Sequence, residues 1–166
     1  MFSEQQFTQE IQTHQGIIFK VCLLYSHSAE DREDLFQEIV LQAWKSIGNF
    51  RGESKFSTWL YQVSLNTAIS WFKKENKKNN LFSFWSGSSS ALAHDPWGSN
   101  DKEDAFAEMY NAIKLLNKVD KALITLYLED FDYKTIGEML GITPNNVAVK
   151  MSRAKASLKA LMVNDK

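Results

Sequence analysis

Aromatic and basic side chains are interleaved along one segment of the sequence, residues 50–78. This combination of residue types is the first candidate for a functional site. The aromatic members are Phe50, Phe56, Trp59, Tyr61, Trp71 and Phe72, and the basic members are Arg51, Lys55, Lys73, Lys74, Lys77 and Lys78. Cations of this kind track phosphates while aromatic faces stack on unpaired bases, each stack being worth about 1–3 kcal/mol. The combination favours binding of a single-stranded nucleic acid. For any one aromatic residue, burial in a core is the commoner role, and lysines also suit a helix C-terminus for dipole reasons alone.

Candidates for catalysis are few and scattered. The histidines are His14, His27 and His94, and the one cysteine is Cys22. Glu10 and His14 are four residues apart, as two metal ligands on a helix can be, but no third ligand follows at a known spacing. The sequence also contains no glycine-rich phosphate loop and no nucleophile elbow. We therefore expect a protein that is not an enzyme and that holds no metal and no cofactor.

Residues 131–147 are typical of two short helices that cross at a tight turn. Asp132 can cap the first helix, and Ile136 and Leu140 lie on its inward face. Gly137 leaves room where the helices cross, and Gly141 supplies the left-handed residue that ends the first helix. This is the layout of a helix-turn-helix, in which the second helix enters a DNA major groove.

The second of these helices is predicted to be long and basic. Thr143 caps it, and Pro144 fits its first turn, where a missing N–H costs nothing. Val147 and Met151 form its buried face. The basic positions outside that face are Lys150, Arg153, Lys155 and Lys159. An ordinary pair of antiparallel helices would give the same spacing, but the basic second helix and the small residue at the crossing favour DNA binding.

Apolar residues at three- to four-residue spacing predict further helices upstream. One spans residues 3–25, a second follows a capping pattern at residues 28–31, and a third begins after Ser54 and ends in the basic run 73–78. The expected inward faces are Phe7, Ile11, Ile18, Val21 and Tyr25 in the first helix, Leu35, Ile39, Ala43 and Ile47 in the second, and Phe56, Leu60, Val63 and Thr67 in the third.

The second helix has apolar residues on more than one side. A second row lies beside its inward face and is flanked by polar groups. The row is Phe36, Val40 and Trp44, and its polar neighbours are Asp34, Gln37 and Glu38. This pattern suggests a docking face for another protein. Burial by the neighbouring helices of the same domain explains it equally well.

Residues 79–100 interrupt the helical pattern. Asn, Ser and Gly make up 11 of these 22 positions, which is linker composition. Five apolar residues are more than a spacer needs, so either they dock on a domain or a partner covers them. They are Leu81, Phe82, Phe84, Trp85 and Trp97. We predict an all-α protein with two small helical domains, residues 1–78 and 101–166, and helices in the second near residues 101–116, 118–129, 132–140 and 144–162.

The net charge of the 166 residues is −1, but it is unevenly distributed. Residues 51–80 carry +4 and residues 132–166 carry +3, whereas residues 1–50 and 81–131 carry −4 each. Such basic islands suggest polyanion contact at two separate places. The lone cysteine, the lack of an apolar run of about 18 residues and the lack of a signal peptide favour a cytoplasmic protein.

Taken together, these residues resemble the sigma-70 family of initiation factors. The family's second region is similar to residues 31–38, Ala43-Trp44, Phe50-Arg51-Gly52, residues 56–60 and Asn66-Thr67-Ala68. The tail is similar to its fourth region and ends in Arg153-Ala154-Lys155 followed by Leu158. The short, two-domain extracytoplasmic-function (ECF) class is the most similar. Two motif blocks in the right order are far more specific than a lone helix-turn-helix.

The resemblance implies a factor that binds core RNA polymerase and directs promoter-specific initiation. The implied polymerase-binding residues, which would meet the clamp coiled coil of the largest subunit, are Asp34, Leu35, Phe36, Gln37, Glu38, Val40 and Trp44. The implied minus-10 contacts, including the site of a flipped base, are Phe50, Arg51, Gly52, Lys55, Trp59, Tyr61, Asn66, Lys73 and Lys74. The implied minus-35 contacts are Thr143, Asn145, Asn146, Ala148, Val149, Lys150, Ser152, Arg153 and Lys155. The implied partners are core polymerase, through its clamp and flap, promoter DNA and an anti-sigma factor, with no small-molecule substrate and no membrane insertion.

The sequence departs from the family pattern at several positions. Ala148 and Val149 replace a common pair of Lys or Arg followed by Ser on the recognition helix. Their side chains imply readout through thymine methyl groups and DNA shape rather than through polar contacts. Asn117 stands where the family usually has Pro, and Lys121 replaces a frequent Arg.

Overall fold

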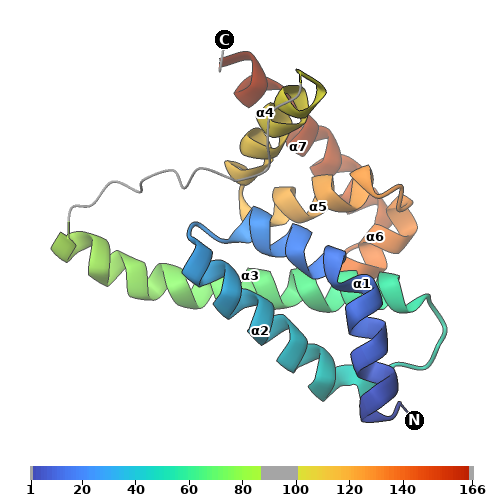
Figure 1. The fold of residues 1–166 in the computed structure, drawn as a ribbon. Helices are drawn as coiled ribbons and strands as arrows, with labels where there is room; N and C mark the ends of the chain where they lie inside the picture. The colour runs from blue at the N-terminus through green and yellow to red at the C-terminus, as the bar shows by residue number, and fades with distance from the viewer. Residues whose placement is uncertain (1, 87–100, 165–166) are drawn as a thin grey trace. The chain divides into compact units, whose positions relative to one another are not determined.

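The computed structural model describes residues 2–86 and 101–164, with side chains described for residues 2–71 and 107–163. Within these ranges its regular secondary structure is entirely helical (Figure 1). The chain divides into two compact units, one holding the first three α-helices and the other the last four. The predicted all-α fold with two helical domains is confirmed. None of the described helices combines the length and the apolar character that crossing a membrane requires.

The first two helices each begin after a serine that caps them. Helix α1 (Glu4–Tyr25) follows Ser3, whose hydroxyl accepts from the Gln6 N–H at 3.2 Å while the Ser3 N–H donates to Gln6 Oε1 at 2.9 Å. This reciprocal pair satisfies two N–H groups that the helix leaves unpaired. Helix α2 (Ala29–Ser46) follows Ser28, whose hydroxyl accepts from the Asp31 N–H at 3.0 Å.

A short 3-10 helix, η1 (Ile47–Asn49), and a loop of residues 50–55 lead to α3 (Phe56–Ser86). Helix α3 is longer than predicted, because the basic run at residues 73–78 does not end it. The sequence from residue 56 to residue 86 contains neither Gly nor Pro, so no residue forces the backbone out of the helix before Gly87. Eight positions assigned to the linker are therefore helical. The predicted roles of the linker's aromatic side chains lie outside the described side chains.

Helices α1, α2 and α3 pack against one another around the core of the first unit (Figure 1). All the inward residues predicted for α1 and α2 are buried, together with Ile47. Helix α3 differs from the prediction, since Phe56, Val63 and Thr67 are only half-buried. The buried apolar residues of α3 are Leu60, Tyr61, Leu65 and Ala68. Both rows follow the 3.6-residue period, so the pattern alone does not select the inward one.

The second unit contains α4 (Asp101–Lys114), α5 (Lys118–Leu128), α6 (Tyr133–Leu140) and α7 (Pro144–Asn164). Helix α7 packs against the three others and is the centre of this unit. The largest fully buried side chains are Ile113, Leu123, Ile124, Leu126, Ile136 and Met151. The packed helices therefore fix α7 by one face and leave its other face to solvent.

Candidate nucleic-acid interfaces

Helices α6 and α7 form the predicted helix-turn-helix, and every capping contact is in place. Asp132 Oδ1 accepts from the Thr135 N–H at 2.7 Å, and these hydrogen bonds to Thr135 hold the pKa of the carboxyl below its usual range. Gly141 ends α6 with φ of 73°, in the left-handed region. Thr143 Oγ1 accepts from the Asn146 N–H at 3.2 Å and so caps α7. The turn is built from local hydrogen bonds and one left-handed glycine.

Gly137 sets how closely α6 approaches the start of α7. A Cβ atom at this position would lie 2.6 Å from the backbone oxygen of Ile142, closer than real Cβ contacts occur. The Ile142 N–H donates to the Gly137 oxygen at 2.9 Å across the same contact. No side chain other than hydrogen fits here, so the predicted role of Gly137 is confirmed.

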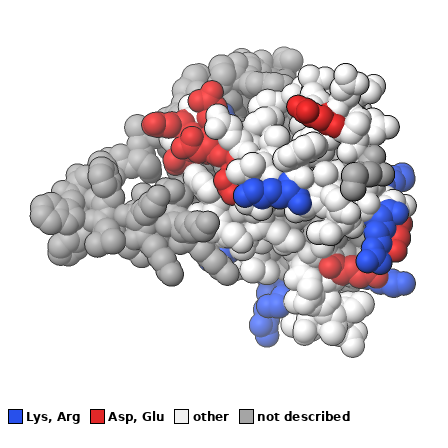
Figure 2. All heavy atoms as spheres, turned by 90° about the horizontal axis from the view of Figure 1, so that it is seen from below, with Lys and Arg blue, Asp and Glu red and all other residues white. Residues whose placement is uncertain are grey.

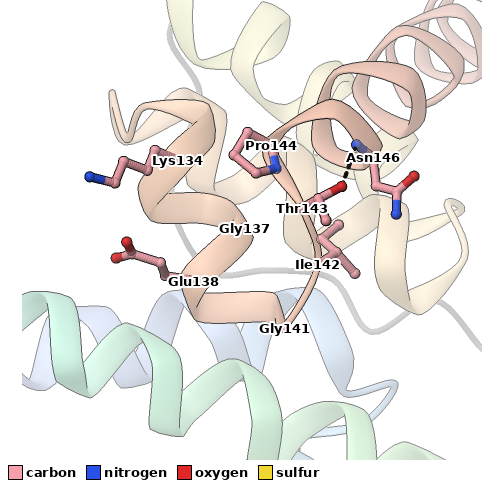
Figure 3. A pocket seen from close by; sticks show the side chains of 8 residues that line it. All are labelled: Lys134, Gly137, Glu138, Gly141, Ile142, Thr143, Pro144 and Asn146. Carbon is pink, nitrogen blue, oxygen red and sulfur yellow. Dashed lines mark hydrogen bonds between the residues drawn. The ribbon is translucent and has the colours of Figure 1, made fainter.

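A hollow of about 540 Å³ lies at the turn between the two helices (Figure 3). In the close-up the side chains of Lys134 and Glu138 extend from α6, while Thr143, Pro144 and Asn146 lie across the turn at the start of α7. The hollow is thus lined by both polar and apolar groups and by the first turn of the helix that would enter DNA. Free N–H groups at a helix start attract anions such as phosphate.

The predicted reading face of α7 is wholly exposed. All nine proposed minus-35 contacts are exposed: Thr143, Asn145, Asn146, Ala148, Val149, Lys150, Ser152, Arg153 and Lys155. Val147, Met151 and Ala154 take the opposite, buried face. Lys155 Nζ lies 3.9 Å from the centroid of the Tyr127 ring, so α5 orients this cation. Helix α7 therefore separates a packing face from a polar and basic face.

The loop before α3 carries the second candidate site. Its residues 51–55 are all exposed, and Gly52 has φ of 73°. The rings of Phe50, Phe56 and Trp59 form a cluster at its base, with Phe50–Trp59 at 5.4 Å and Phe56–Trp59 at 5.3 Å between centroids. All three rings are half-buried. The loop therefore carries two exposed cations, Arg51 and Lys55, between residues whose rings are half-buried.

The structure adds two residues of the N-terminal segment that the sequence did not single out for this site. Phe2 lies 5.8 Å from Phe50 and 6.1 Å from Phe56 between ring centroids. His14 lies 5.6 Å from Phe56 and pairs with Glu10 at 3.5 Å. No short-range pattern could reveal these contacts, because they join segments far apart in sequence.

Helix α3 divides the remaining proposed minus-10 residues. Trp59 and Asn66 are seven residues apart and return to the same side of the helix, and Asn66 is exposed. Tyr61 lies about 200° round the helix from Trp59 and is only 5% exposed. Its burial in the core conflicts with a strand contact, so we leave it out of the proposed interface. Positions 73 and 74 are helical, but the side chains of Lys73 and Lys74 lie outside the described ones.

The proposed docking row of α2 is partly open to solvent. Phe36 and Val40 are half-buried, whereas Trp44 is 43% exposed and packs its edge on Phe7 at 5.0 Å. Asp34 and Gln37 are exposed, and Glu38 accepts from Gln42 Nε2 at 2.8 Å. Leu35 is 0% exposed, so it supports this row from the core and we leave it out of the proposed interface. Phe19, 48% exposed and 4.9 Å from Phe36, extends the row onto α1.

On the described surface drawn in Figure 2, basic side chains lie beside acidic ones. Figure 2 shows one face on which acidic side chains form a group and much of the remaining described surface is uncharged. The cations proposed to contact DNA therefore act locally, at the loop and on α7.

Cys22, one of the residues considered for catalysis, lies in the core of the first unit. Cys22 is buried, and burial raises the pKa of its thiol to about 12, against a smaller opposing effect of Arg32. A thiol of this kind is a poor nucleophile. Among the side chains described, those of residues 2–71 and 107–163, no group of three His, Cys, Asp or Glu is arranged to hold a metal ion.

Two family models match the chain in the order of its two units. Residues 11–78 match Sigma-70 region 2, and residues 106–158 match Sigma-70, region 4. Together these segments cover more than two thirds of the chain. This chain belongs to the sigma-70 family. Regions 2 and 4 are the parts of sigma factors that recognise the minus-10 and minus-35 promoter elements.

Similar curated proteins are RNA polymerase sigma factors. The sigma-H factor of Pseudomonas aeruginosa is 30% identical over 128 residues, which are 76% of this chain and 58% of that protein. This family member thus spans less than two thirds of the length of that relative. The ECF sigma factor SigW of Bacillus subtilis is 24% identical over 165 residues, 94% of this chain and 88% of SigW. The predicted resemblance to the ECF class is confirmed.

Two solved structures share the fold of this sigma-70 family member. One is the sigma factor RpoE in complex with the anti-sigma factor NepR from Bartonella quintana, with a TM-score of 0.71, 21% identity and coverage of 98% of this chain and 99% of that one. The other is CnrH in complex with the cytosolic domain of CnrY, with a TM-score of 0.66, 17% identity and coverage of 99% and 92%.

One of the departures from the family pattern has a structural explanation. Asn117 caps α5, since its Oδ1 accepts from the Asp120 N–H at 2.9 Å and so performs a task that proline cannot. Lys121 is 3% exposed, and burial together with the nearby Lys114 lowers its pKa to about 8. Ala148 and Val149 are both exposed, so no packing requirement of the fold explains their apolar side chains.

Proposed function

We propose that this sigma factor binds core RNA polymerase in the cytoplasm, opens promoter DNA at the loop before α3 and reads the minus-35 duplex with α7. The single observation that carries the proposal is the pairing of two exposed sites within the two matched regions. One combines half-buried aromatic rings with the cations Arg51 and Lys55, and the other is a basic face on a helix-turn-helix. One site suits unpaired bases and the other suits a major groove.

Helix α2 is the proposed contact with the clamp coiled coil of the largest polymerase subunit. Its row of Phe36, Val40 and Trp44 offers apolar area that the first unit leaves partly uncovered. Asp34 and Gln37 supply a polar rim beside it. A partly open apolar row with a polar rim is the composition of a protein interface. The second unit would meet the polymerase flap.

The loop of residues 50–55 is the proposed site for a base flipped from the minus-10 element. Flipping costs a few kcal/mol, which stacking on aromatic rings can offset. Trp59 supplies such a ring, and Asn66 lies farther along the same side of α3 with an amide able to bond a base edge. Arg51 and Lys55 neutralise the phosphates beside the open strand.

Helix α7 is the proposed reader of the minus-35 element. Thr143, Asn145 and Asn146 stand at its start, where recognition helices contact base edges. Lys150 and Arg153 suit phosphate contacts. Ala148 and Val149 offer methyl groups that suit thymine C5-methyl groups.

The chemistry of transcription stays with the polymerase in this proposal, and the sigma factor has no catalytic site. Regulation by an anti-sigma factor fits as well, since the similar RpoE and CnrH were solved with NepR and CnrY. The sensing of a small ligand by the N-terminal helices is the competing possibility, and it gives no reason for aromatic rings and cations at the loop.

Run-off transcription with purified core polymerase on genomic fragments tests the proposal directly. We expect transcripts that start at specific promoters only when the sigma factor is added. Tight binding of a ligand or of duplex DNA by the free protein, with no promoter-dependent transcript on any fragment, would overturn it.

Trp59→Ala separates the two DNA sites. We expect open-complex formation, followed by permanganate reactivity of unpaired thymines, to fall by about tenfold, the size of one lost stacking contact. Binding of the holoenzyme to a minus-35 duplex should change less than twofold, because that contact is made by the other unit. Trp59→Phe, which keeps a ring, is the control. A general loss of helix in Trp59→Ala but not in Trp59→Phe would assign Trp59 to the core instead.

A further inference from the structure

Two phenylalanines bracket the exposed loop at its base. Phe50 ends η1, with its N–H donating to the Ile47 oxygen at 3.1 Å, and Phe56 is the first residue of α3. Their rings meet edge-on at 6.0 Å between centroids. Because the five residues between them are exposed, packing does not hold the loop along its length. Its shape depends on how its two ends are fixed.

Phe2 contacts both ends of the loop at once. Its ring lies 5.8 Å from that of Phe50 and 6.1 Å from that of Phe56, tilted to both. The backbone beside it is fixed, since Ser3 and Gln6 form the reciprocal capping pair at the start of α1. Phe2 is half-buried, as are both of its partners. It therefore bridges the two ends of a loop that lies far along the sequence.

His14 supports the same arrangement from farther along α1. Its ring lies 5.6 Å from that of Phe56, and Glu10 holds it from one turn earlier at 3.5 Å. The N-terminal segment thus contacts the base of the loop at two points, Phe2 before α1 and His14 within it. Trp59 completes the cluster on the side of α3.

We infer that Phe2 is a positioning residue for the minus-10 site: by bridging Phe50 and Phe56 it fixes the shape of the loop that receives the flipped base. The inference rests on the proposed function of that loop. Phe2 acts through its two partners and has no contact of its own with the base. Its loss should widen the range of loop shapes, and a looser pocket discriminates less between bases.

The test uses full-length holoenzymes on one promoter found by run-off transcription, with each of the four bases in turn at the flipped position. Phe2→Ala should lower open-complex formation by about tenfold on the preferred base, in line with two lost ring contacts. It should also shrink the preference over the other three bases. Phe2→Tyr, which keeps the ring, should restore both readouts. Binding of core polymerase should not change.

Leu41→Ala is the matched control, because it removes a half-exposed apolar side chain from the same unit at a position outside both proposed interfaces. Its base preference should equal that of the wild type, whatever its affinity for polymerase. If Phe2→Ala lowers the melting temperature of the free protein, Phe2→Leu replaces it, and the base preference of that folded variant decides.

The outcomes separate this inference from the function on which it rests. If Phe2→Ala keeps the wild-type opening and base preference while Trp59→Ala loses opening, Phe2 has only a packing role and the inference is wrong. If neither variant affects opening on a functioning promoter, the loop is not the minus-10 site and the proposed function of the loop fails.

Discussion

Lys121 is a buried lysine whose charge should make the stability of the second unit depend on pH. Its folded pKa is lowered from 10.5 to about 8, chiefly because burial disfavours the ammonium and also because Lys114 lies near. Between these values the unfolded chain binds more protons than the folded one, so the free energy of unfolding rises with pH. Below about pH 8 both states are protonated and the full cost of the buried charge remains.

Lys121→Met should remove this dependence. Between about pH 8 and pH 10 the wild type should gain up to about 1.4 kcal/mol per pH unit relative to the variant. Urea denaturation followed by circular dichroism measures the difference. A constant offset between the two curves reports packing and the other interactions of the side chain, whereas only the slope reports its titration. Parallel curves from pH 7 to pH 10 would show that Lys121 keeps an ordinary pKa.

Val149 is exposed on the reading face of α7, where a polar residue would be easier to explain. If it contacts a thymine methyl group, Val149→Ala should weaken binding to a selected minus-35 duplex about fourfold, the value of roughly one buried CH₂ group. Replacing that thymine by deoxyuridine should cost the wild type the same factor and cost the variant little. Fluorescence anisotropy with the holoenzyme measures all four combinations.

Val163→Ala is the matched control for this cycle, since Val163 is also exposed on α7 but lies near its C-terminal end. It should leave the effect of deoxyuridine unchanged. Fully additive effects of Val149→Ala and of every deoxyuridine would contradict the methyl contact.

At the scale of elements, replacing either of two helical glycines by alanine should change the stability of the protein in opposite directions. Gly137 has no room for a Cβ atom, because the Ile142 oxygen would lie 2.6 Å away. Gly16 in α1 has nothing within 4 Å of the same atom. Gly137→Ala should therefore cost about 3 kcal/mol or prevent α6 and α7 from packing. Gly16→Ala should add about 0.5–1 kcal/mol, since alanine favours a helix over glycine.

Thermal melting of both variants by circular dichroism measures these effects. The pair is matched in chemistry, so a difference in sign reports the surroundings of each glycine alone. Wild-type stability in Gly137→Ala would mean that the turn relaxes without loss, and the close crossing would then not limit the fold.

The helices themselves were largely predictable, because capping residues and glycines close in sequence determine where most of them begin and end. Ser28, Asp132 and Thr143 cap the helices that they were expected to cap, and Gly141 ends α6. The predicted end of α3 was wrong, because a basic run is compatible with a helix end but does not cause one. Local chemistry thus predicts where a helix must stop better than where it happens to continue.

The candidate sites were predictable in composition but not in geometry. The family resemblance placed Tyr61 and Leu35 among the contact residues, yet both are buried, and for Leu35 the periodic pattern itself had predicted burial. The ring contacts of Phe2 and Phe19 join segments that lie apart in the sequence. Such contacts depend on how helices pack, and no periodic pattern within one helix encodes them.

At the scale of the whole molecule, the net charge of −1 gives little long-range attraction for DNA. The free protein should bind promoter duplex only weakly, on the order of 10⁻⁴–10⁻⁶ M as for non-specific binding. With core polymerase present, binding to a promoter should tighten by at least about a hundredfold and become specific. Anisotropy titrations with and without core enzyme measure the gain, and a scrambled promoter is the control. Equal, tight and specific binding by the free protein would point to a conventional DNA-binding regulator.

Helix α3 runs for 31 residues without a break. An insertion in it would therefore change both the direction and the distance of every residue beyond the insertion. Each residue turns the helix by 100° and advances it by about 1.5 Å. Trp59, Asn66 and position 73 therefore share one side because they are spaced seven residues apart, which is close to two full turns of the helix. Inserting one alanine after Asn66 would swing everything beyond it to another side, whereas inserting seven would restore the direction about 10 Å farther along. The tolerance of this sigma factor to changes of length in α3 should rise and fall with the turn of the helix.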